Sequence, residues 1–560
     1  MKKSCLLLLI FLLNFSIFAQ VTSDAELINS DHWIYDDFIT LSLETNTGNF
    51  SVNTPVSAGE LKLYFKDYDR EKLSDSGKVV YDRVQAYLFT KRNLFPTKFF
   101  NTGIGLKVAP ELCYKSNPQI DWTYNYFYKE NPLNADLRLG ISDYFSLGGD
   151  FFFGKNYKYS NMPNNFTNIP LGGDQYEFVF PRFAYGSAGA TFNKWGFNIN
   201  VGKEGMQIGH TKTGSIIYNN TFETDGYFQL TVYCDDAKYT MDVVEVEQNK
   251  FLYWHEIDLR FFKKVKIGLM EGALVNAPFE LRFLTPTMVF HSYAFWKDFL
   301  SGNEEKYYNE SHCCSYLGLT FDINLIKNLR IYGLYAMNEI QLPNEYANWK
   351  DQAYPDSLGG QLGAELKLPS DFGGYWKSSL ELLYCSPFLY IKQAPDWSLY
   401  RARRDNVTCE NVNSWIGSPF GPDNFSVNFA FEYEQTGKWK AGFNYLLSLH
   451  GENGFGLFDQ KYFDSEKNIW KYYPYTKFIY ATDSGSYDDM AAAVAEGRNM
   501  QMTKVIECKH QISLNGAYTF NKWITIESEV VYTFVLNSGH IADNFQHGFQ
   551  GAISVEYKVF

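Results

Sequence analysis

Short segments in which apolar and polar residues alternate run through most of this chain, and they constrain its fold more than any other feature. In residues 251–261, FLYWHEIDLRF, every second side chain from Phe251 to Phe261 is mostly apolar, whereas those between are mostly polar. The same pattern recurs in residues 524–534. A period of two places the two sets on opposite faces of a β-strand. The sequence therefore predicts a protein built mainly of half-buried strands.

Aromatic residues are unusually abundant and narrow the choice of fold class. They make up 18% of the 560 residues, with 42 Tyr, 48 Phe and 12 Trp. Disordered chains are poor in such residues, so a largely disordered protein is excluded. After residue 20 no run of about 18 apolar residues occurs, which excludes a helical membrane protein. A large soluble β protein and an outer-membrane β-barrel remain, and a barrel accommodates aromatic rings on its lipid face and in two girdles.

Residues 1–20, MKKSCLLLLIFLLNFSIFAQ, have the parts of a secretory signal peptide. Lys2 and Lys3 form the positive region, an apolar stretch follows, and Ala19 supplies a small residue before the cleavage position. Retention as a membrane anchor is the alternative, although the apolar run is short for a span. We expect export to the outer membrane of a bacterial cell.

Residues 21–98 show helical rather than strand periodicity. Apolar residues recur at helical spacing between positions 61 and 65 and again between 79 and 88. Ser57 followed by Glu60 forms a capping box, and Ser74 and Ser76 are N-cap candidates for the next helix. The pattern predicts a small helical domain of two or three helices on the periplasmic side, capping or plugging something larger.

Residues 99–560 are predicted to form the outer-membrane β-barrel. TFNKW occurs at 191–195 and again at 519–523, and KNLRI at 327–331 and KWKAG at 438–442 resemble it as basic tight turns before a strand. Longer polar stretches separate other strands. Short turns at one end and long loops at the other are expected of such barrels. At roughly 25 residues per strand with its connection, about 18 antiparallel strands are expected. A multi-sheet soluble β protein is the alternative.

The chain ends in GAISVEYKVF, an amphipathic strand with a final aromatic residue, Phe560. This end resembles the signal that the barrel-insertion machinery of the outer membrane reads, although Phe560 lies out of phase with the apolar face. The insertion machinery and outer-membrane lipids are therefore expected partners. The net charge of -13 argues against nucleic acid as a partner.

Two regions carry a family resemblance. Residues 195–233 contain a strand that ends in a glycine-containing turn, VGKEGMQIG, and a second strand. Residues 251–291 contain a strand–turn–strand block with a polar, Leu and Pro element, carried by His255, Gly268, Glu271, Leu281, Leu284 and Pro286. These regions resemble the capsule assembly Wzi family of outer-membrane proteins, and HWIYDDF at 32–38 resembles its N-terminal helical part. Lys203 stands where the family often has Arg.

The resemblance implies a barrel of about 18 strands with a periplasmic helical bundle. It also implies a non-enzymatic role in binding or assembling capsular polysaccharide, with an acidic exopolysaccharide as the candidate ligand. The loops at 393–425 and 459–504 are long and specific to this chain. A porin-like diffusion channel for small solutes is the second hypothesis, and a barrel hydrolase is the third.

The loop at 393–425 contains the first group of candidate ligand-binding residues. Three aromatic residues offer faces that stack on sugar rings, and three arginines offer donors to the carboxylates of an acidic glycan. The six residues are Trp397, Tyr400, Arg401, Arg403, Arg404 and Trp415. Two other roles fit them equally, neutralisation of lipopolysaccharide phosphates and a constriction folded into the lumen.

The second candidate group is a polar network in the lumen. His255 and Glu271 lie on strands that are expected to face one another, with Arg260 and Arg282 as counter-charges. Such a network would serve as a ligand or gating contact, or only as a structural one. Because His255 is in phase with apolar residues, a place in the interfacial belt is the alternative for it.

No catalytic residue, cofactor or metal site is predicted. His312–Cys313–Cys314 is the densest cluster of potential ligands, but adjacent cysteines do not easily bind one tetrahedral metal. Removal of the signal peptide leaves seven cysteines, an odd number without a CxxC pair, and Cys385–Cys409 is one possible disulfide among them.

Overall fold

The computed structural model describes most of the chain after the predicted signal peptide. The described residues are 21–50, 53–90, 100–121, 132–154, 165–169, 177–179, 183–219, 225–287, 289–290, 313–340, 356–392, 398–404, 411–455, 461–464, 469–472, 502, 505–521 and 523–559. The predicted signal peptide, Trp397 and Phe560 therefore lie outside the described residues.

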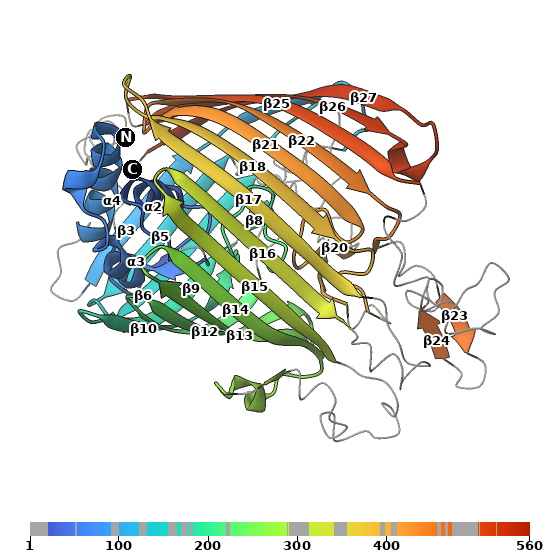
Figure 1. The fold of residues 1–560 in the computed structure, drawn as a ribbon, viewed down its shortest axis with the longest axis horizontal. Coiled ribbons are helices and arrows are strands. Elements are labelled where there is room, and N and C mark those ends of the chain that lie inside the picture. Colours follow the sequence, from blue (N-terminus) through green and yellow to red (C-terminus); the bar gives the residue numbers. More distant parts are fainter. Residues whose placement is uncertain are drawn as a thin grey trace, which may run out of the picture.

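A closed antiparallel β-barrel forms most of the structure (Figure 1). Its first strands are β3 (Phe100–Val108), β4 (Glu111–Lys115), β5 (Leu133–Ile141), β6 (Phe145–Gly154), β7 (Asn165–Thr167), β8 (Glu177–Val179), β9 (Ala184–Thr191) and β10 (Trp195–Glu204). The middle strands are β11 (Asp225–Cys234), β12 (Ala237–Glu247), β13 (Lys250–Phe261), β14 (Val265–Asn276), β15 (Cys313–Ile326), β16 (Leu329–Glu339), β17 (Ser357–Pro369) and β18 (Tyr375–Cys385). The last strands are β21 (Asn424–Gln435), β22 (Trp439–His450), β25 (Glu507–Phe520), β26 (Ile524–Leu536) and β27 (Gln546–Lys558).

Each long strand pairs with its neighbour in sequence, and β27 returns to β3 and β4 to close the barrel. Among the described residues, 18 strands cross the barrel when β3 with β4, and β8 with β9, count once each and the short β7 is left out. This confirms the expected barrel of about 18 antiparallel strands. The break between β3 and β4 falls at Ala109–Pro110, where proline lacks the N–H that a strand ladder requires.

The two ends of the barrel differ as the turn pattern predicts. TFNKW at 191–195 joins β9 to β10, and its repeat at 519–523 joins β25 to β26, both at the end where the two termini lie (Figure 1). We call this the helical end. Long connections such as 205–224, 277–312 and 386–423 leave the opposite end, which we call the loop end.

The strand faces follow the alternation of the sequence. On β13, Ile257 and Leu259 face outwards with 49% and 40% of their surface exposed, whereas Glu256 and Asp258 face the lumen at 2% and 1%. An apolar outer face and a polar lumen are the arrangement that a hydrocarbon surrounding requires. No helix in the described part of the chain is long and apolar enough to cross a membrane.

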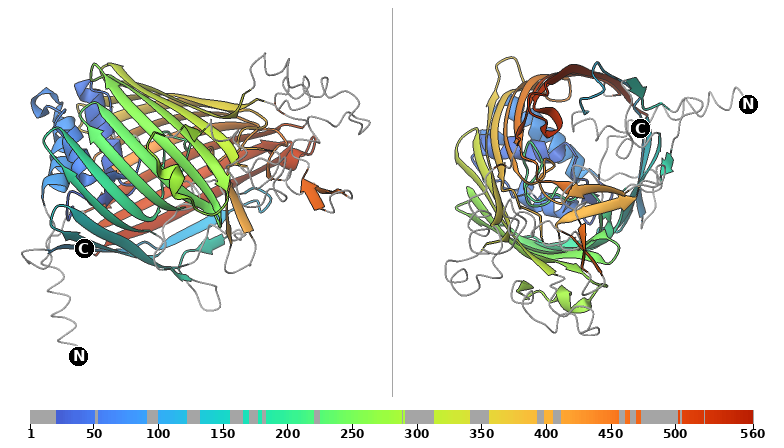
Figure 2. Two further views of the ribbon diagram at one scale, coloured as in Figure 1. Left: turned by 90° about the horizontal axis from the view of Figure 1, so that it is seen from below. Right: turned by 90° about the vertical axis from the view of Figure 1, so that its right-hand side faces the viewer.

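Residues 21–50 and 53–90, which we call the helical segment, pack into the helical end of the barrel (Figure 2). Its elements are β1 (Leu27–Ile28), α2 (Ile34–Thr45), β2 (Val56–Ser57), α3 (Ala58–Phe65), the 3₁₀ turn η1 (Arg70–Lys72) and α4 (Asp75–Phe89). The Ser57 side chain accepts a hydrogen bond from the Glu60 backbone N–H, as the capping box predicts. Ser74, the first of the two N-cap candidates, caps α4.

Candidate functional site

Four stretches from the loop end fold back into the lumen instead of standing above the barrel (Figure 2). Together they form what we call the lumenal plug, which packs against the inner face of β11 to β18. Its stretches are residues 205–219, residues 386–392, the hairpin of β19 (Tyr400–Arg404) and β20 (Asn411–Trp415) with the residues that flank it, and residues 451–455. Ile216, Tyr390 and Ile416 within it are 0% exposed.

Glu381 on β18 fixes the first stretch of the plug. Its carboxylate accepts hydrogen bonds from the backbone N–H groups of Lys212 at 2.9 Å and Thr213 at 3.0 Å. The Tyr332 hydroxyl donates to the same carboxylate at 2.5 Å. Glu381 is 1% exposed, so these donors supply the hydrogen bonds that its buried oxygens require, and the loop backbone becomes part of the wall's polar network.

Arg401 fixes the hairpin. Its Nε donates to Asp225 at the start of β11 at 2.9 Å, and the two side chains are 0% and 2% exposed. Its other nitrogens donate to the backbone oxygens of Trp415 at 3.2 Å and Asn219 at 3.0 Å. The guanidinium also lies 5.0 Å from the centre of the Tyr218 ring. The charge is thus paired and hydrogen-bonded, which a buried arginine requires.

Aromatic rings fill the loop end of the plug. Trp415 stacks on Phe455 with ring centroids 4.1 Å apart and planes at 8°. Tyr400 meets Phe455 edge-on at 5.7 Å, and Lys250 Nζ lies 3.8 Å from the centre of the Tyr400 ring. These rings therefore pack against one another, and Tyr400 and Trp415 are only 8% and 7% exposed.

The plug is continuous with the helical segment. Thr54 and Gln207 form an antiparallel bridge in which each backbone N–H donates to the other residue's oxygen, at 2.9 Å and 3.0 Å. At the other end of the same stretch, the Asn219 N–H donates to the Ile416 oxygen of the hairpin at 2.9 Å. The lumen therefore contains a connected column of chain from its helical end to its loop end.

Buried ion pairs join the helical segment to the barrel wall. Glu60 on α3 pairs with Lys238 on β12 at 2.7 Å, with side chains 2% and 4% exposed. Arg260 on β13 pairs with Asp67 at 2.5 Å. The Tyr375 hydroxyl on β18 donates to Glu44 at 2.5 Å. These contacts reach different strands, so the segment is held on several sides.

Asp36 on α2 lies between two lysines of the wall. Its carboxylate is 3.6 Å from Lys367 Nζ and 3.5 Å from Lys377 Nζ, and His210 of the plug is 3.7 Å away. Burial raises the pKa of this carboxyl, but the two lysines outweigh burial and hold the pKa well below its usual value. Asp36 therefore joins the helical segment to the wall by charge, and it also contacts His210 of the plug.

The six candidate residues of the 393–425 loop are only partly placed. Tyr400, Arg401 and Trp415 come together inside the plug, where their contacts are with other residues of the protein. Trp397 lies outside the described residues, and Arg403 and Arg404 are described only as backbone of β19. The described residues of the hairpin lie inside the lumen and not on an exposed surface loop.

The structure does not bring the four residues of the expected lumenal network together. His255 and Glu271 are directly opposite in the register of β13 and β14, as expected, but they lie on the outward phase of the two strands. Arg260 lies on the opposite phase, at the helical end, bound to Asp67. Arg282 is outside the wall, 2.5 Å from Glu280. The alternation of a strand separates His255 from Arg260, and this corrects the expected network.

His255 lies beneath a segment that turns down the outer wall, residues 277–287 and 289–290, which we call the outer cover. It includes the 3₁₀ turn η3 (Leu281–Leu284). Phe283 packs on Tyr253 of β13 with ring centroids 4.8 Å apart, and Phe290 stacks on His255 at 4.8 Å and 17°. The Tyr239 hydroxyl lies 2.6 Å from His255 Nδ1 and donates to the Pro286 oxygen at 3.1 Å. His255, 8% exposed, is thereby shielded on the outer face.

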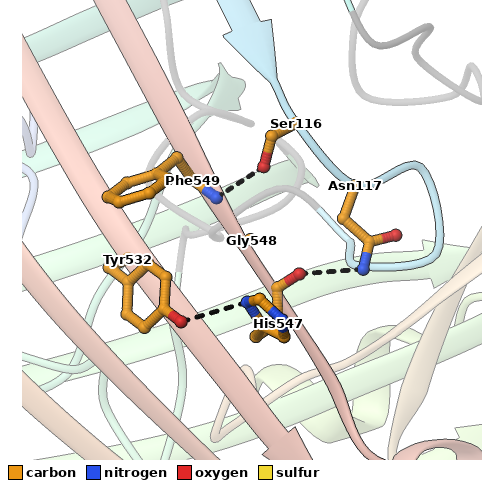
Figure 3. A pocket seen from close by; sticks show the side chains of 6 residues that line it. All are labelled: Ser116, Asn117, Tyr532, His547, Gly548 and Phe549. Carbon is orange, nitrogen blue, oxygen red and sulfur yellow. Dashed lines mark hydrogen bonds between the residues drawn. The ribbon is translucent and has the colours of Figure 1, made fainter.

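Sequence reasoning missed a cavity of about 590 Å³ on the outer face at the loop end (Figure 3). It is lined by Ser116, Asn117, Tyr532, His547, Gly548 and Phe549. The Asn117 side chain donates to the His547 oxygen at 2.9 Å, across a separation of 430 residues. No local motif connects positions so far apart, and only closure of the barrel through β27 brings them together.

A further part of the lumenal surface is rich in uncharged polar side chains. Amide and hydroxyl side chains line the inner face of β21, β22, β25 and β26. They are Asn424, Ser426, Asn428, Asn444, Ser448, Gln511, Ser513, Asn515 and Thr533. Within the described part of the chain, no cluster of three or more His, Cys, Asp or Glu side chains could hold a metal ion. His312 and Cys409 lie outside the described residues.

Comparisons with known proteins agree on the fold. The structure is similar to Wzi of Escherichia coli, described as an outer membrane protein involved in group 1 capsule assembly and a carbohydrate-binding β-barrel. The TM-score is 0.55 at 11% identity, over 95% of this chain and 99% of that one. The chain has the fold of an outer-membrane β-barrel.

Other likenesses are weaker. OprD of Pseudomonas aeruginosa gives a TM-score of 0.39 at 9% identity over 82% of this chain and 93% of that one. OmpT of Vibrio cholerae gives 0.31 at 10% identity over 83% and 99%. These two scores are too low to bear on function. No protein-family model matches the sequence, and a search of curated proteins gives no match either.

Proposed function

We propose that the protein spans the outer membrane and binds an exported polysaccharide at its loop end, without acting as an open diffusion channel or an enzyme. In the proposed orientation, the helical segment faces the periplasm and the long loops face the cell exterior. The observation that carries the proposal is the lumenal plug. Its buried pairs, Arg401 with Asp225 and Thr213 with Glu381, fix it to the wall.

A diffusion channel needs a continuous water path through the lumen. Along β11 to β18 that space is filled by plug residues such as Ile216 and Tyr390, both 0% exposed. The helical segment closes the same side at the helical end through Lys238 and Arg260. A barrel filled in this way is better suited to hold a ligand at its surface than to let solutes pass.

Two observations support carbohydrate as the ligand class. The barrel shares its fold with a protein described as a carbohydrate-binding β-barrel. Its own lumen wall also presents amides and hydroxyls, such as Asn444 and Ser513, which both donate to and accept from sugar hydroxyls. Uncharged polar groups of this kind form hydrogen bonds without the desolvation cost of a buried charge.

We assign different roles to the arginines of β19. Arg401 holds the hairpin, because its donors are committed to Asp225 and to two backbone oxygens. Arg403 and Arg404, with Trp397, stay predicted contacts to the carboxylates of an acidic glycan.

The glycan assignment is tested with alginate as an acidic probe and dextran as a neutral one. The double variant Arg403→Ala with Arg404→Ala should weaken alginate binding at least about tenfold, or about 1.4 kcal/mol. Dextran binding should change little. Lys194→Ala with Lys438→Ala removes the same charge at the helical end and should leave alginate binding intact. Equal losses in the two double variants, or no alginate binding at all, would refute the assignment.

A conductance measurement distinguishes the proposed binding function from that of a diffusion channel. Purified wild-type protein in planar bilayers should give no stable open-channel current, because the plug occupies the lumen. A variant that releases the hairpin provides the positive control, as described below for Arg401. Steady currents from the wild type, in the range of porins, would favour the diffusion channel and overturn the proposal.

A further inference from the structure

We propose that the cavity between the ends of β4, β26 and β27 binds the uncharged sugar headgroup of an amphiphile, whose hydrocarbon chain lies along the outer face of β27. The proposal rests on the membrane location proposed above and is independent of polysaccharide binding by the loops. It assigns a lipid-linked ligand to the outer wall, away from the plug (Figure 3).

Two aromatic rings form one side of the cavity. Tyr532 and Phe549 are directly opposite in the register of β26 and β27. Their ring centroids are 4.8 Å apart with planes at 55°, and 55% of Phe549 is exposed. An open ring face beside a hydroxyl-bearing ring provides an apolar surface with a polar edge, which is what the face of a sugar ring packs against.

Polar groups form the other side, and they are held in place. The Ser116 hydroxyl accepts a hydrogen bond from the Phe549 N–H at 2.8 Å, and Asn117 donates to the His547 oxygen at 2.9 Å. The Tyr532 hydroxyl lies 3.0 Å from His547 Nδ1. The cavity is therefore preorganised before a ligand enters.

The chemistry of the lining selects an uncharged headgroup. The lining residues carry hydroxyl, amide, imidazole and aromatic groups, and none of them is Lys, Arg, Asp or Glu. A phosphate headgroup would call for arginine or lysine partners. A sugar needs only hydrogen-bonding groups and an apolar face, and these are the groups present.

A strip of exposed apolar side chains continues from the cavity towards the helical end, and we take the glycine within it as the floor of a groove. Gly551 is the next outward residue of β27 after Phe549, and a Cβ built there would meet nothing closer than a carbonyl oxygen at 3.9 Å. Its register partners on either side, Tyr114 and Val530, are 55% and 51% exposed. Further along, Ile553 and Leu112 are 49% and 61% exposed. Because Gly551 has no side chain, there is space for a hydrocarbon chain between these exposed apolar neighbours.

The headgroup cavity and the groove are joined at Phe549. A ligand with a sugar headgroup and a hydrocarbon chain therefore gains binding contacts in both. A free sugar would gain only the cavity contacts, and a plain hydrocarbon only the groove. The two substitutions that test the proposal therefore act on separate parts of one ligand. Phe549→Ala removes the ring platform, and Gly551→Leu fills the groove without crowding the backbone.

The experiment uses the full-length protein in zwitterionic micelles, titrated with n-dodecyl maltoside and followed by native mass spectrometry. The wild type should retain one maltoside, and each of the two variants should weaken its retention about tenfold or more. Heat-dependent gel migration checks that each variant remains a folded barrel. Free maltose should compete at least about a hundredfold less effectively than the alkyl maltoside.

A matched control lies at the other end of the barrel. A dent of about 570 Å³ there is also lined by aromatic residues, among them Trp439, Tyr518 and Phe520. Tyr518→Ala should leave maltoside retention unchanged. Equal loss in this control, or equal retention of a zwitterionic detergent of the same chain length, would overturn the proposal. Full competition by free maltose would identify a free-glycan site and would also overturn it.

Discussion

The hairpin of the lumenal plug and the outer cover begin at the same end of the barrel and fold in opposite directions. Both are rich in aromatic residues, and both bury several of their rings against strands of the wall. The hairpin enters the lumen, where Arg401 meets Asp225. The outer cover descends the outside, where Phe283 and Phe290 meet the rings of Tyr253 and His255.

The difference lies in what each face of a strand offers. Inward positions carry carboxylates and lysines, so a segment that brings an arginine or open backbone N–H groups finds partners there. Outward positions carry apolar and aromatic side chains. A segment that contributes mainly aromatic rings is therefore stabilised there by the apolar surface that it buries. We therefore expect the hairpin to depend on charge and the outer cover to depend on packing.

The largest effect is expected from Arg401→Ala. The substitution leaves the buried Asp225 carboxylate of the wall without its guanidinium partner, and loss of one member of a buried pair costs about 3–5 kcal/mol. The hairpin should detach, which limited proteolysis within 398–416 and new conductance in planar bilayers would report. Arg403→Ala is the neighbouring control and should have neither effect. A closed, protease-resistant Arg401→Ala protein would show that aromatic packing alone holds the hairpin.

Phe283→Ala should have the next largest effect. Phe283 is 1% exposed, and truncation of a Phe in a fully buried protein core lowers stability by about 3–5 kcal/mol. Lipid or detergent can fill the space that the substitution leaves beside the outer cover. We therefore expect a loss of stability of roughly 2 kcal/mol, which is below the range for a fully buried protein core. Protease cleavage within 277–290 should increase, while conductance stays absent. Leu281→Ala is the control, since Leu281 is 75% exposed. Opening of the lumen by Phe283→Ala would contradict the separation of the two segments.

The alternation and turns of the sequence predict most of the barrel, and the residues show why. A period of two in residues 251–261 fixes a strand and the faces of its side chains, and TFNKW marks turns at the helical end. The capping box at Ser57 and Glu60 is equally local. Each of these signals depends only on neighbouring residues.

The candidate sites depend on contacts that are distant in sequence. Arg401 reaches Asp225 across 176 residues, and nothing in either segment indicates that a long loop folds inwards. His255 is in phase with apolar residues, which already indicated an outward position and was the better guide than its pairing with Glu271. The cavity at His547 exists only because β27 closes the barrel beside β4.

Tyr239→Phe tests the polar part of the outer cover. The hydroxyl donates to the Pro286 oxygen and lies beside His255 Nδ1, so its removal should cost about 1 kcal/mol. We expect a modest increase in hydrogen exchange within the outer cover, smaller than that of Phe283→Ala. Tyr335→Phe, on the outer face of β16, is the control. A larger loss than for Phe283→Ala would mean that hydrogen bonding rather than packing holds this segment.

Acid provides the smallest effect and the clearest contrast between the two regions. Lys367 and Lys377 hold the pKa of Asp36 below its usual value of 3.8, so its stabilising charge is fully present above about pH 4 and is lost as the pH falls through the lowered pKa. Pepsin cleavage of the helical segment should therefore increase between pH 4 and pH 2. In Asp36→Asn the increase over that range should be smaller, because the contribution of this carboxylate is already absent. The outer cover, held by rings, should show no such transition, and an acid transition of equal size there would remove the electrostatic distinction between the lumen and the outer wall.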